Sequence, residues 1–208
     1  MDVRQVFLLS PARCDGRRAA LLLRPQGASS AAESLRAGTL TLGEAFSFMS
    51  ALYFRGKLTY ARAFGGDAEA APTTYIITPT RGLQTPETLV TTSILQEFAS
   101  TDIASGDMAY RAPLDRDLAA LAGRLTPPTR TILLGSIASG KYVDALRLFL
   151  GERLYFPASF VGRGDMSRGG LLLRSAAAGV ELEYARLDGE SIRRGTRPPK
   201  LGPLARRG

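Results

Sequence analysis

The stretch Arg130-Thr-Ile-Leu-Leu-Gly135-Ser-Ile-Ala-Ser-Gly140-Lys141-Tyr142-Val-Asp-Ala-Leu146 decides the fold class, because it reads as a strand, a turn and a helix in succession. The apolar run before Gly135 predicts a buried strand. The spacing from Gly135 to Lys141 is that of a loop that holds a phosphate with backbone N–H groups and a lysine. An Mg²⁺-dependent nucleoside triphosphatase needs Ser or Thr where Tyr142 stands, so we interpret the loop as an anion contact.

The rest of the chain alternates strands with helices, which predicts a single α/β domain with a mixed, largely parallel sheet and helices on both faces. We expect this domain to span residues 1–188. The expected strands are 3–10, 20–24, 73–78, 132–134, 154–156 and 180–185, and the expected helices are 44–64, 114–125, 143–150 and 166–177.

The composition excludes several kinds of catalytic site. The 208-residue chain contains no histidine and one cysteine, Cys14. Ser-His-Asp and Cys-His nucleophile systems and His-bearing zinc sites are therefore impossible within one chain, and we expect neither a metal nor a cofactor. A single cysteine cannot form an intramolecular disulfide and is typical of a reducing cytoplasm, where we place the protein. Since no apolar run approaches the length of a membrane span, we expect no membrane association.

The positive charge gathers at the C-terminal end. Seven basic and two acidic residues between positions 186 and 208 give +5 of the total net charge of +8. Residues 189–208 are rich in Pro, Gly and Arg without apolar periodicity, so we expect a flexible basic tail. Such a tail either follows nucleic-acid phosphates or serves only as a solubilising terminus in an arginine-rich chain.

Loops after the expected strands carry the candidate site, because open α/β sheets bind ligands beyond the carboxyl ends of their strands. Loops 9–13, 78–83 and 135–141 each combine small residues, a hydroxyl and a cation. A fourth segment, 160–174, places Gly, Arg and Ser before a helix with Asp165 as the expected N-cap. The candidate phosphate- or base-binding residues are Ser10, Arg13, Thr80, Arg81, Gly82, Gly135, Ser136, Gly140, Lys141, Tyr142, Arg163, Gly164, Ser167 and Arg168.

Short motifs in these loops carry a family resemblance. Phe7-Leu-Leu-Ser10-Pro11-Ala12 resembles the opening strand and loop of the bacterial peroxide-stress protein YaaA family, and Met166-Ser167-Arg168 is similar to a later segment of that family. The succession of 52–55, 75–83 and 133–142 resembles a related bacterial domain of unknown function. The YaaA resemblance implies an α/β fold with a basic cleft, DNA binding and a role in limiting oxidative DNA damage.

Three functions fit these observations. The first is a nucleic-acid-binding protein with a basic cleft, in which DNA is favoured over RNA and Tyr53, Tyr75 or Tyr142 stacks on a base. The second is a metal-independent N-glycosylase-like hydrolase, with Asp15 as the candidate catalytic carboxylate and Asp165 and Glu97 as weaker candidates. The third is a small-nucleotide-binding protein that relies on the 135–141 loop. The sequence leaves the oligomeric state open.

Overall fold

A six-stranded sheet forms the centre of the molecule in the part of the chain that the structure describes. This computed structural model describes residues 4–65, 72–103, 107–137, 140–188, 195–196, 198–199 and 202. The strand order is β3-β2-β1-β4-β5-β6, with β2, β1, β4 and β5 parallel and the two edge strands antiparallel. The strands are β1 (Gln5–Leu9), β2 (Thr74–Ile77), β3 (Leu83–Gln84), β4 (Arg130–Leu134), β5 (Leu154–Pro157) and β6 (Tyr184–Arg186). The predicted α/β class and the mixed, largely parallel sheet are confirmed.

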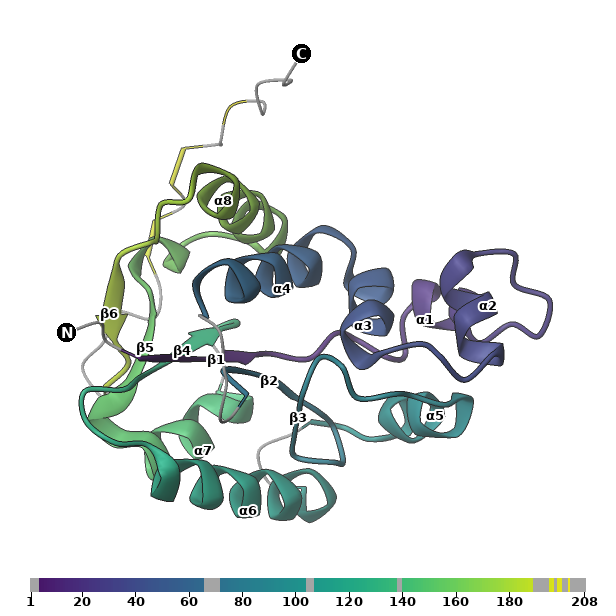
Figure 1. Cartoon of the computed structure of the whole chain (residues 1–208), viewed down its shortest axis with the longest axis horizontal. Coiled ribbons are helices and arrows are strands. Elements are labelled where there is room, and N and C mark those ends of the chain that lie inside the picture. Colours follow the sequence, from purple (N-terminus) through teal and green to yellow (C-terminus); the bar gives the residue numbers. More distant parts are fainter. Residues whose placement is uncertain are drawn as a thin grey trace.

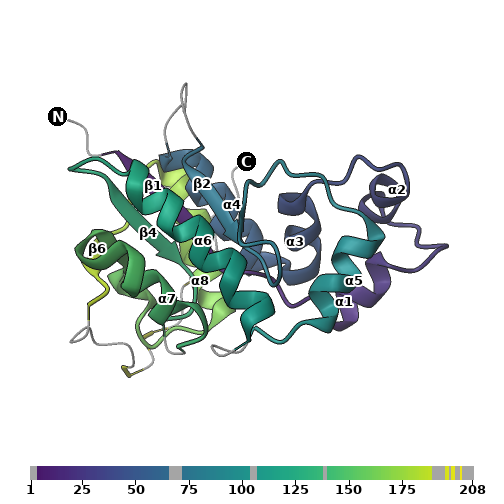
Figure 2. The same ribbon diagram turned by 90° about the horizontal axis from the view of Figure 1, so that it is seen from below.

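Helices cover both faces of this sheet, as predicted. Helices α4 (Leu52–Phe64) and α8 (Asp165–Ala178) lie on one face, and α6 (Met108–Arg124) and α7 (Gly140–Leu150) lie on the other (Figures 1 and 2). Along β1, Phe7 and Leu9 pack in the core beneath α4, whereas Val6 and Leu8 pack in the core with α6 and α7. Burial on both faces explains why the central strands are continuously apolar.

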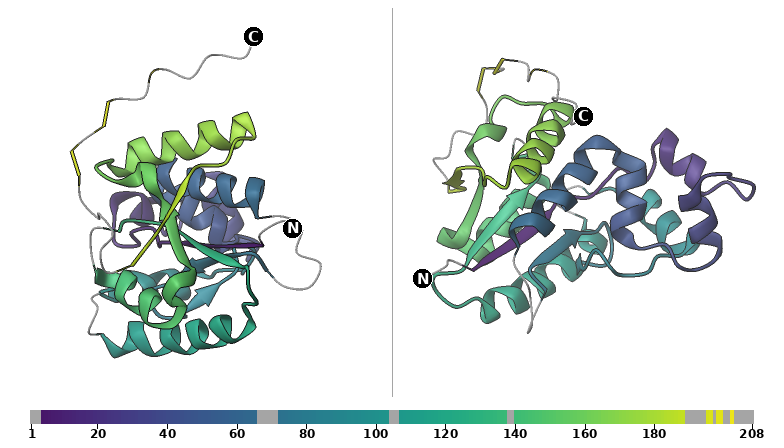
Figure 3. Two further views of the ribbon diagram at one scale, coloured as in Figure 1. Left: turned by 90° about the vertical axis from the view of Figure 1, so that its left-hand side faces the viewer. Right: turned by 45° about the horizontal axis from the view of Figure 1, so that its top comes forward.

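Helices α4 and α8 lie side by side (Figure 3), and two glycines allow their close contact. A Cβ atom on Gly56 would lie 2.7 Å from the carbonyl oxygen of Gly169, and a Cβ atom on Gly169 would lie 2.7 Å from the carbonyl oxygen of Leu52. Any larger residue at either position must therefore push the two backbones apart. The sequence places Gly56 inside an expected helix, and the structure gives the reason for a glycine there.

Four helices lie beyond the carboxyl end of β1, where β1 leads into α1 (Figure 1). They are α1 (Arg17–Leu22), α2 (Ser30–Arg36), α3 (Leu42–Ser50) and α5 (Thr92–Ser100). Helix α3 begins with a capping box, in which the Thr41 hydroxyl accepts from the Glu44 backbone and the Glu44 carboxylate accepts from the Thr41 backbone. A β-bridge between Thr41 and Leu89 joins the start of α3 to the segment before α5.

Two expectations for the first part of the chain are wrong. Residues 20–24 were expected as a strand, but Ala20 to Leu22 belong to α1, because Ala and Leu are strong helix formers and no strand of the described sheet lies beside them. The single helix expected over 44–64 is two helices, because Ala51 has a φ of 48° and breaks the helical path between α3 and α4.

Three helix details also differ from expectation. Helix α5 was not predicted. Helix α6 begins at Met108 with Asp107 as its N-cap, so Pro113 lies inside the helix rather than at its start. Asp165 is the first residue of α8 and Gly164 is the N-cap, which leaves the cap without a side-chain hydrogen bond.

The remaining described elements are short. They are the 3₁₀ helices η1 (Gly151–Arg153) and η2 (Ala158–Phe160). Most of the predicted tail, 189–208, lies outside the described residues; of its described parts, Pro199 accepts a hydrogen bond from Arg163 and Gly202 accepts one from Arg174. None of the described helices combines the length and apolar character required to cross a membrane.

Candidate functional site

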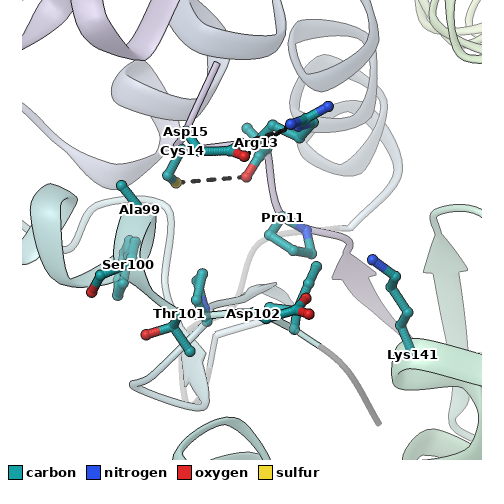
Figure 4. Close-up of a pocket in the computed structure, with 13 residues that line it drawn as sticks. Pro11, Arg13, Cys14, Asp15, Ala99, Ser100, Thr101, Asp102 and Lys141 are labelled. Carbon is teal, nitrogen blue, oxygen red and sulfur yellow. Dashed lines mark hydrogen bonds and ion pairs between the residues drawn. The ribbon is translucent and has the colours of Figure 1, made fainter. Parts of the chain in front are cut away.

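A cavity of about 640 Å³ lies at the carboxyl ends of β1 and β2, and we call it the edge cavity. The loop after β1 forms one wall, the end of α5 forms a second, and Lys141 at the start of α7 borders it (Figure 4). The chain leaves β1 toward β2 on one side and later enters β4 on the other, so the strand order reverses between β1 and β4. Open α/β sheets bind ligands at such a reversal, and the volume is typical of small-molecule sites.

The walls of the edge cavity combine apolar and polar groups. Phe98, Ile103 and Pro11 supply apolar surface. The remaining lining residues are Ala12, Arg13, Cys14, Asp15, Pro79, Ala99, Ser100, Thr101, Asp102 and Lys141. In Figure 4 Lys141 extends toward the cavity from one side, and Ser100 and Thr101 lie on the opposite side.

Arg13 and Asp15 form an exposed ion pair at the rim. The Arg13 guanidinium donates to both carboxylate oxygens of Asp15, with N···O distances of 3.0 and 2.8 Å. This hydrogen bonding lowers the pKa of Asp15 below its ordinary value. The Asp15 carboxylate is therefore ionised at neutral pH and suited to stabilise a positive charge rather than to donate a proton.

Lys141 is an exposed cation in the first turn of the eleven-residue helix α7. The N-terminus of a helix offers unpaired backbone N–H groups and a partial positive charge to an anion. Residues 138–139 lie outside the described residues, so only the two ends of the predicted phosphate loop, 135–137 and 140–141, are placed. Lys141 lines the edge cavity, and its role as a phosphate contact stays a prediction.

A buried polar cluster lies beside the cavity, and we call its residues the Lys57 cluster. It comprises Ser10, Tyr53, Lys57, Tyr142 and Arg168. The Lys57 amine donates to the Ser10 carbonyl oxygen at 2.6 Å and to the Ser10 hydroxyl at 2.9 Å. Burial raises the pKa of the Tyr142 hydroxyl, whereas the neighbouring Ser10 side chain and Ser136 backbone lower it. These contacts connect the ends of β1 and β4 at the reversal of strand order.

Gly135 fits tightly over this cluster. A Cβ atom there would lie 2.8 Å from Ser10 Cβ and 3.0 Å from the Tyr142 hydroxyl oxygen. The structure thus brings together Ser10, Gly135, Ser136 and Tyr142, which the sequence grouped as one candidate site. Gly135 packs against Ser10 and Tyr142, and Ser10 accepts hydrogen bonds from Lys57, so these residues support the loop that forms the cavity wall.

Lys57 lies in an unusual environment for a lysine. Its residue is 1% exposed, and burial lowers the pKa of the amine to about 7; the Asp165 carboxylate raises that pKa and the Arg168 guanidinium lowers it further. The amine nitrogen also lies 4.6 Å from the ring centres of Tyr53 and Phe54. A cation over aromatic rings is partly stabilised, but burial is the stronger effect here.

Tyr53 adds an unpaired hydroxyl to the cluster. Among the described residues the Tyr53 hydroxyl is buried without a hydrogen-bond partner. Burial raises its pKa, whereas the nearby Arg168 guanidinium lowers it. Arg168 directs its own hydrogen bonds to the Phe160 carbonyl oxygen and to Asp165.

The sequence analysis did not identify Lys57. One signal for it was present: the chain has only three lysines among 27 basic residues, and this one stands in an aromatic-rich helix. It shares the buried face of α4 with Tyr53, Phe54, Tyr60 and Ala61. A lysine at the apolar positions of an amphipathic helix indicates a buried amine.

The 78–83 loop lies apart from the cavity, except for Pro79. Arg81 forms an ion pair with Glu97 at 2.7 Å, and the Thr80 hydroxyl donates to the same carboxylate. Gly82 has a φ of +61°, and a Cβ atom there would clash with the Asp117 carboxylate. Of the ligand contacts predicted in this loop, Thr80 and Arg81 are bonded to Glu97, and Gly82 forms a turn.

The arginines of the predicted 160–174 segment make hydrogen bonds to other groups of the protein. Arg168 is 7% exposed, and its Nε and Nη2 donate to the Phe160 carbonyl oxygen. Arg163 donates to the Ser159 carbonyl oxygen and to the Ser167 hydroxyl. Of the fourteen predicted binding residues, Arg13 and Lys141 line the edge cavity, and the candidate catalytic residue Asp15 lines it with them.

No family model matches this chain, and neither a curated protein nor a solved structure shows a significant match to it.

Proposed function

We propose that this protein binds nucleic acid and takes one nucleotide of the strand into the edge cavity. DNA is the first polymer to test because of the YaaA resemblance in the sequence. The role in oxidative DNA damage that this resemblance implies stays a prediction, as does the cytoplasmic location.

The distribution of polar groups in the cavity supports the proposal. Lys141 and the first turn of α7 offer a positive site for a phosphate at one side. Ser100, Thr101 and Asp102 offer hydroxyl and carboxylate groups at another, which suit a sugar hydroxyl or a base edge. Phe98 and Ile103 give the apolar surface that a base needs. A nucleotide has this same combination of one anionic part and one neutral polar part.

The balance of charge also favours a nucleotide over a bare anion. The cavity is lined by two cations, Arg13 and Lys141, and by two carboxylates, Asp15 and Asp102. Since Arg13 is already paired with Asp15, Lys141 is the cation left for a ligand phosphate at this cavity. The net charge of +8 on the whole chain then attracts the polymer over a longer range.

A matched pair of variants on one helix tests the proposal. Lys141→Ala removes a positive charge from the cavity end of α7, and Arg147→Ala removes one from the last turn of the same helix. Anisotropy of fluorescein-labelled dT12, duplex DNA, RNA of the same length and labelled AMP measures binding. We expect Lys141→Ala to weaken DNA binding about tenfold or more, as for loss of a charge-assisted hydrogen bond, and Arg147→Ala to change it less than about twofold. Equal losses of DNA affinity in both variants would show that the attraction is non-specific. An unchanged affinity in Lys141→Ala would show that DNA does not bind at the edge cavity.

A second function, N-glycosylase-like hydrolysis, is favoured by one observation: Asp15 is an ionised carboxylate on the wall of the same cavity. An ionised carboxylate stabilises the oxocarbenium charge that develops as a glycosidic bond breaks. The test is to incubate the protein with base-modified DNA and to measure abasic sites. Abasic sites that form with the native protein and not with Asp15→Asn would support hydrolysis. If the bases stay intact, the protein binds nucleic acid without hydrolysing it.

A further inference from the structure

The buried amine of Lys57 is directly connected to the wall of the edge cavity. It donates two hydrogen bonds to Ser10, and the next residue, Pro11, lines the cavity. The loop that continues from there carries Arg13 and Asp15. A change in the charge or hydrogen bonding of Lys57 Nζ therefore acts on Ser10, which is bonded directly to the first cavity-lining residue, Pro11.

Lys57 also lies close to the start of α7 by way of Ser10. The Ser10 side chain lowers the pKa of the neighbouring Tyr142 hydroxyl, and Tyr142 follows Lys141 directly in α7. Lys57 thus holds the end of β1, and Ser10 lies beside the first turn of the helix that carries the cavity cation.

The hydrogen bonds of Lys57 are satisfied by a neutral amine. A neutral –NH₂ group has two N–H donors, and among the described residues Nζ has two acceptors, both on Ser10. An ammonium would bring a third N–H and a positive charge. The ring faces of Tyr53 and Phe54 and the Asp165 carboxylate favour that charge, and burial and Arg168 oppose it. The two protonation states are therefore nearly balanced at neutral pH.

The groups that face Lys57 come from every element packed around it. They are Ser10 directly after β1, Tyr53 of its own helix α4, and Asp165 and Arg168 of α8. Asp165 is the single carboxylate among them, and it is largely exposed and paired with Arg168 at 3.5 Å. An anion in the edge cavity would supply the negative charge that this cluster lacks.

We propose that Lys57 is a positioning residue for the edge cavity and that its amine takes up a proton when an anion binds there. This inference rests on the proposed function, and it adds a proton-linked control of that site. By linkage, a ligand that favours the protonated amine binds more tightly where protons are abundant. Affinity should therefore rise as the pH falls from 8 to 6.

The composition makes this effect measurable. The chain has no histidine, and burial raises the pKa of the Cys14 thiol to about 12, so neither type of side chain interferes between pH 6 and 8. The probe is dT12 with hydroxyl ends, whose phosphodiesters and bases do not titrate in that range. Salt concentration is kept constant, because phosphate binding depends strongly on it.

The experiment is calorimetric titration of dT12 into the full chain at pH 6, 7 and 8. At pH 7 it is repeated in two buffers of different ionisation enthalpy, which counts the protons taken up. We expect about fivefold tighter binding at pH 6 than at pH 8 and uptake of about 0.4 proton at pH 7. In Lys57→Met, where an unbranched apolar side chain replaces the amine, both effects should disappear.

The outcomes separate this inference from the proposed function. Binding of equal strength at pH 6 and 8 with no proton uptake overturns the role of Lys57 and leaves nucleic-acid binding in place. A pH dependence that persists in Lys57→Met also overturns it. Absence of binding at every pH overturns the proposed function and this inference together. If Lys57→Met does not fold, proton counting on the native chain still decides between uptake and none.

Discussion

The buried amine of Lys57 makes the stability of the protein depend on pH near neutrality. Its pKa is about 7 in the folded protein and 10.5 as the ordinary value of lysine. Between these two values the unfolded chain holds a proton on this lysine that the folded chain does not hold. The free energy of unfolding therefore rises as the pH rises from 7 toward 10.5.

The expected magnitude follows from the two values. Burial of the charged form destabilises the folded protein by up to about 5 kcal/mol at low pH, at about 1.36 kcal/mol for each pH unit between the two values. From pH 7 to 8.5 the gain in the free energy of unfolding is about 1.5 kcal/mol. Above pH 9 the opposite effect of Cys14, whose folded pKa is raised to about 12, begins to reduce this gain.

Urea denaturation followed by circular dichroism at pH 7, 7.5, 8 and 8.5 measures this effect. The native chain should gain about 1.5 kcal/mol over that range, and Lys57→Met should gain almost none. Lys57→Met should also be the more stable of the two at pH 7, because relief of the buried charge outweighs the two lost hydrogen bonds. A native chain with flat stability, or a variant with the same slope, would refute the assignment of a near-neutral buried amine.

Three further predictions concern packing, the tail and metals. Gly56→Ala should lower the free energy of unfolding by about 2 kcal/mol, because the added Cβ would lie 2.7 Å from the Gly169 carbonyl oxygen. The matched control is Gly123→Ala, whose new Cβ would have no atom within 4 Å. In the same urea assay Gly123→Ala should raise the free energy of unfolding by about 0.5–1 kcal/mol. Deletion of residues 193–208, which contain six of the basic residues, should flatten the salt dependence of DNA affinity, and an unchanged slope would show that the tail makes no phosphate contacts. EDTA should leave DNA binding unchanged, since Tyr142 replaces the hydroxyl ligand that a phosphate-loop Mg²⁺ requires; EDTA-sensitive binding would contradict that reasoning.

Much of the sheet was predictable, because a strand buried on both faces is a local and continuous apolar signal. The runs before Ser10, Thr78 and Gly135 each gave a central strand at nearly the observed position. The break at Ala51 was not predictable, because apolar periodicity continues through it and nothing in the local sequence marks the positive φ at which α3 turns to pack against α4. Helix α5 was missed because it is only nine residues long, which gives a short apolar pattern, and because the β-branched residues Thr92 and Ile94 stand in its first turn.

The site was predictable only in part, and the reason is tertiary. Rules for strand ends placed Ser10, Arg13, Gly135 and Lys141 at one edge of the sheet, and the structure puts them there. Whether a cation is free or paired depends on partners far away in the sequence. Arg81 meets Glu97 sixteen residues later, and the sequence pattern does not show this contact.

A crystal structure of the protein with dT5 examines the proposed cavity most directly. We predict that one nucleotide occupies the edge cavity with a phosphate oxygen within hydrogen-bond distance of Lys141 Nζ and the base against Phe98. A strand bound along another surface, with the edge cavity empty, would contradict the proposed function.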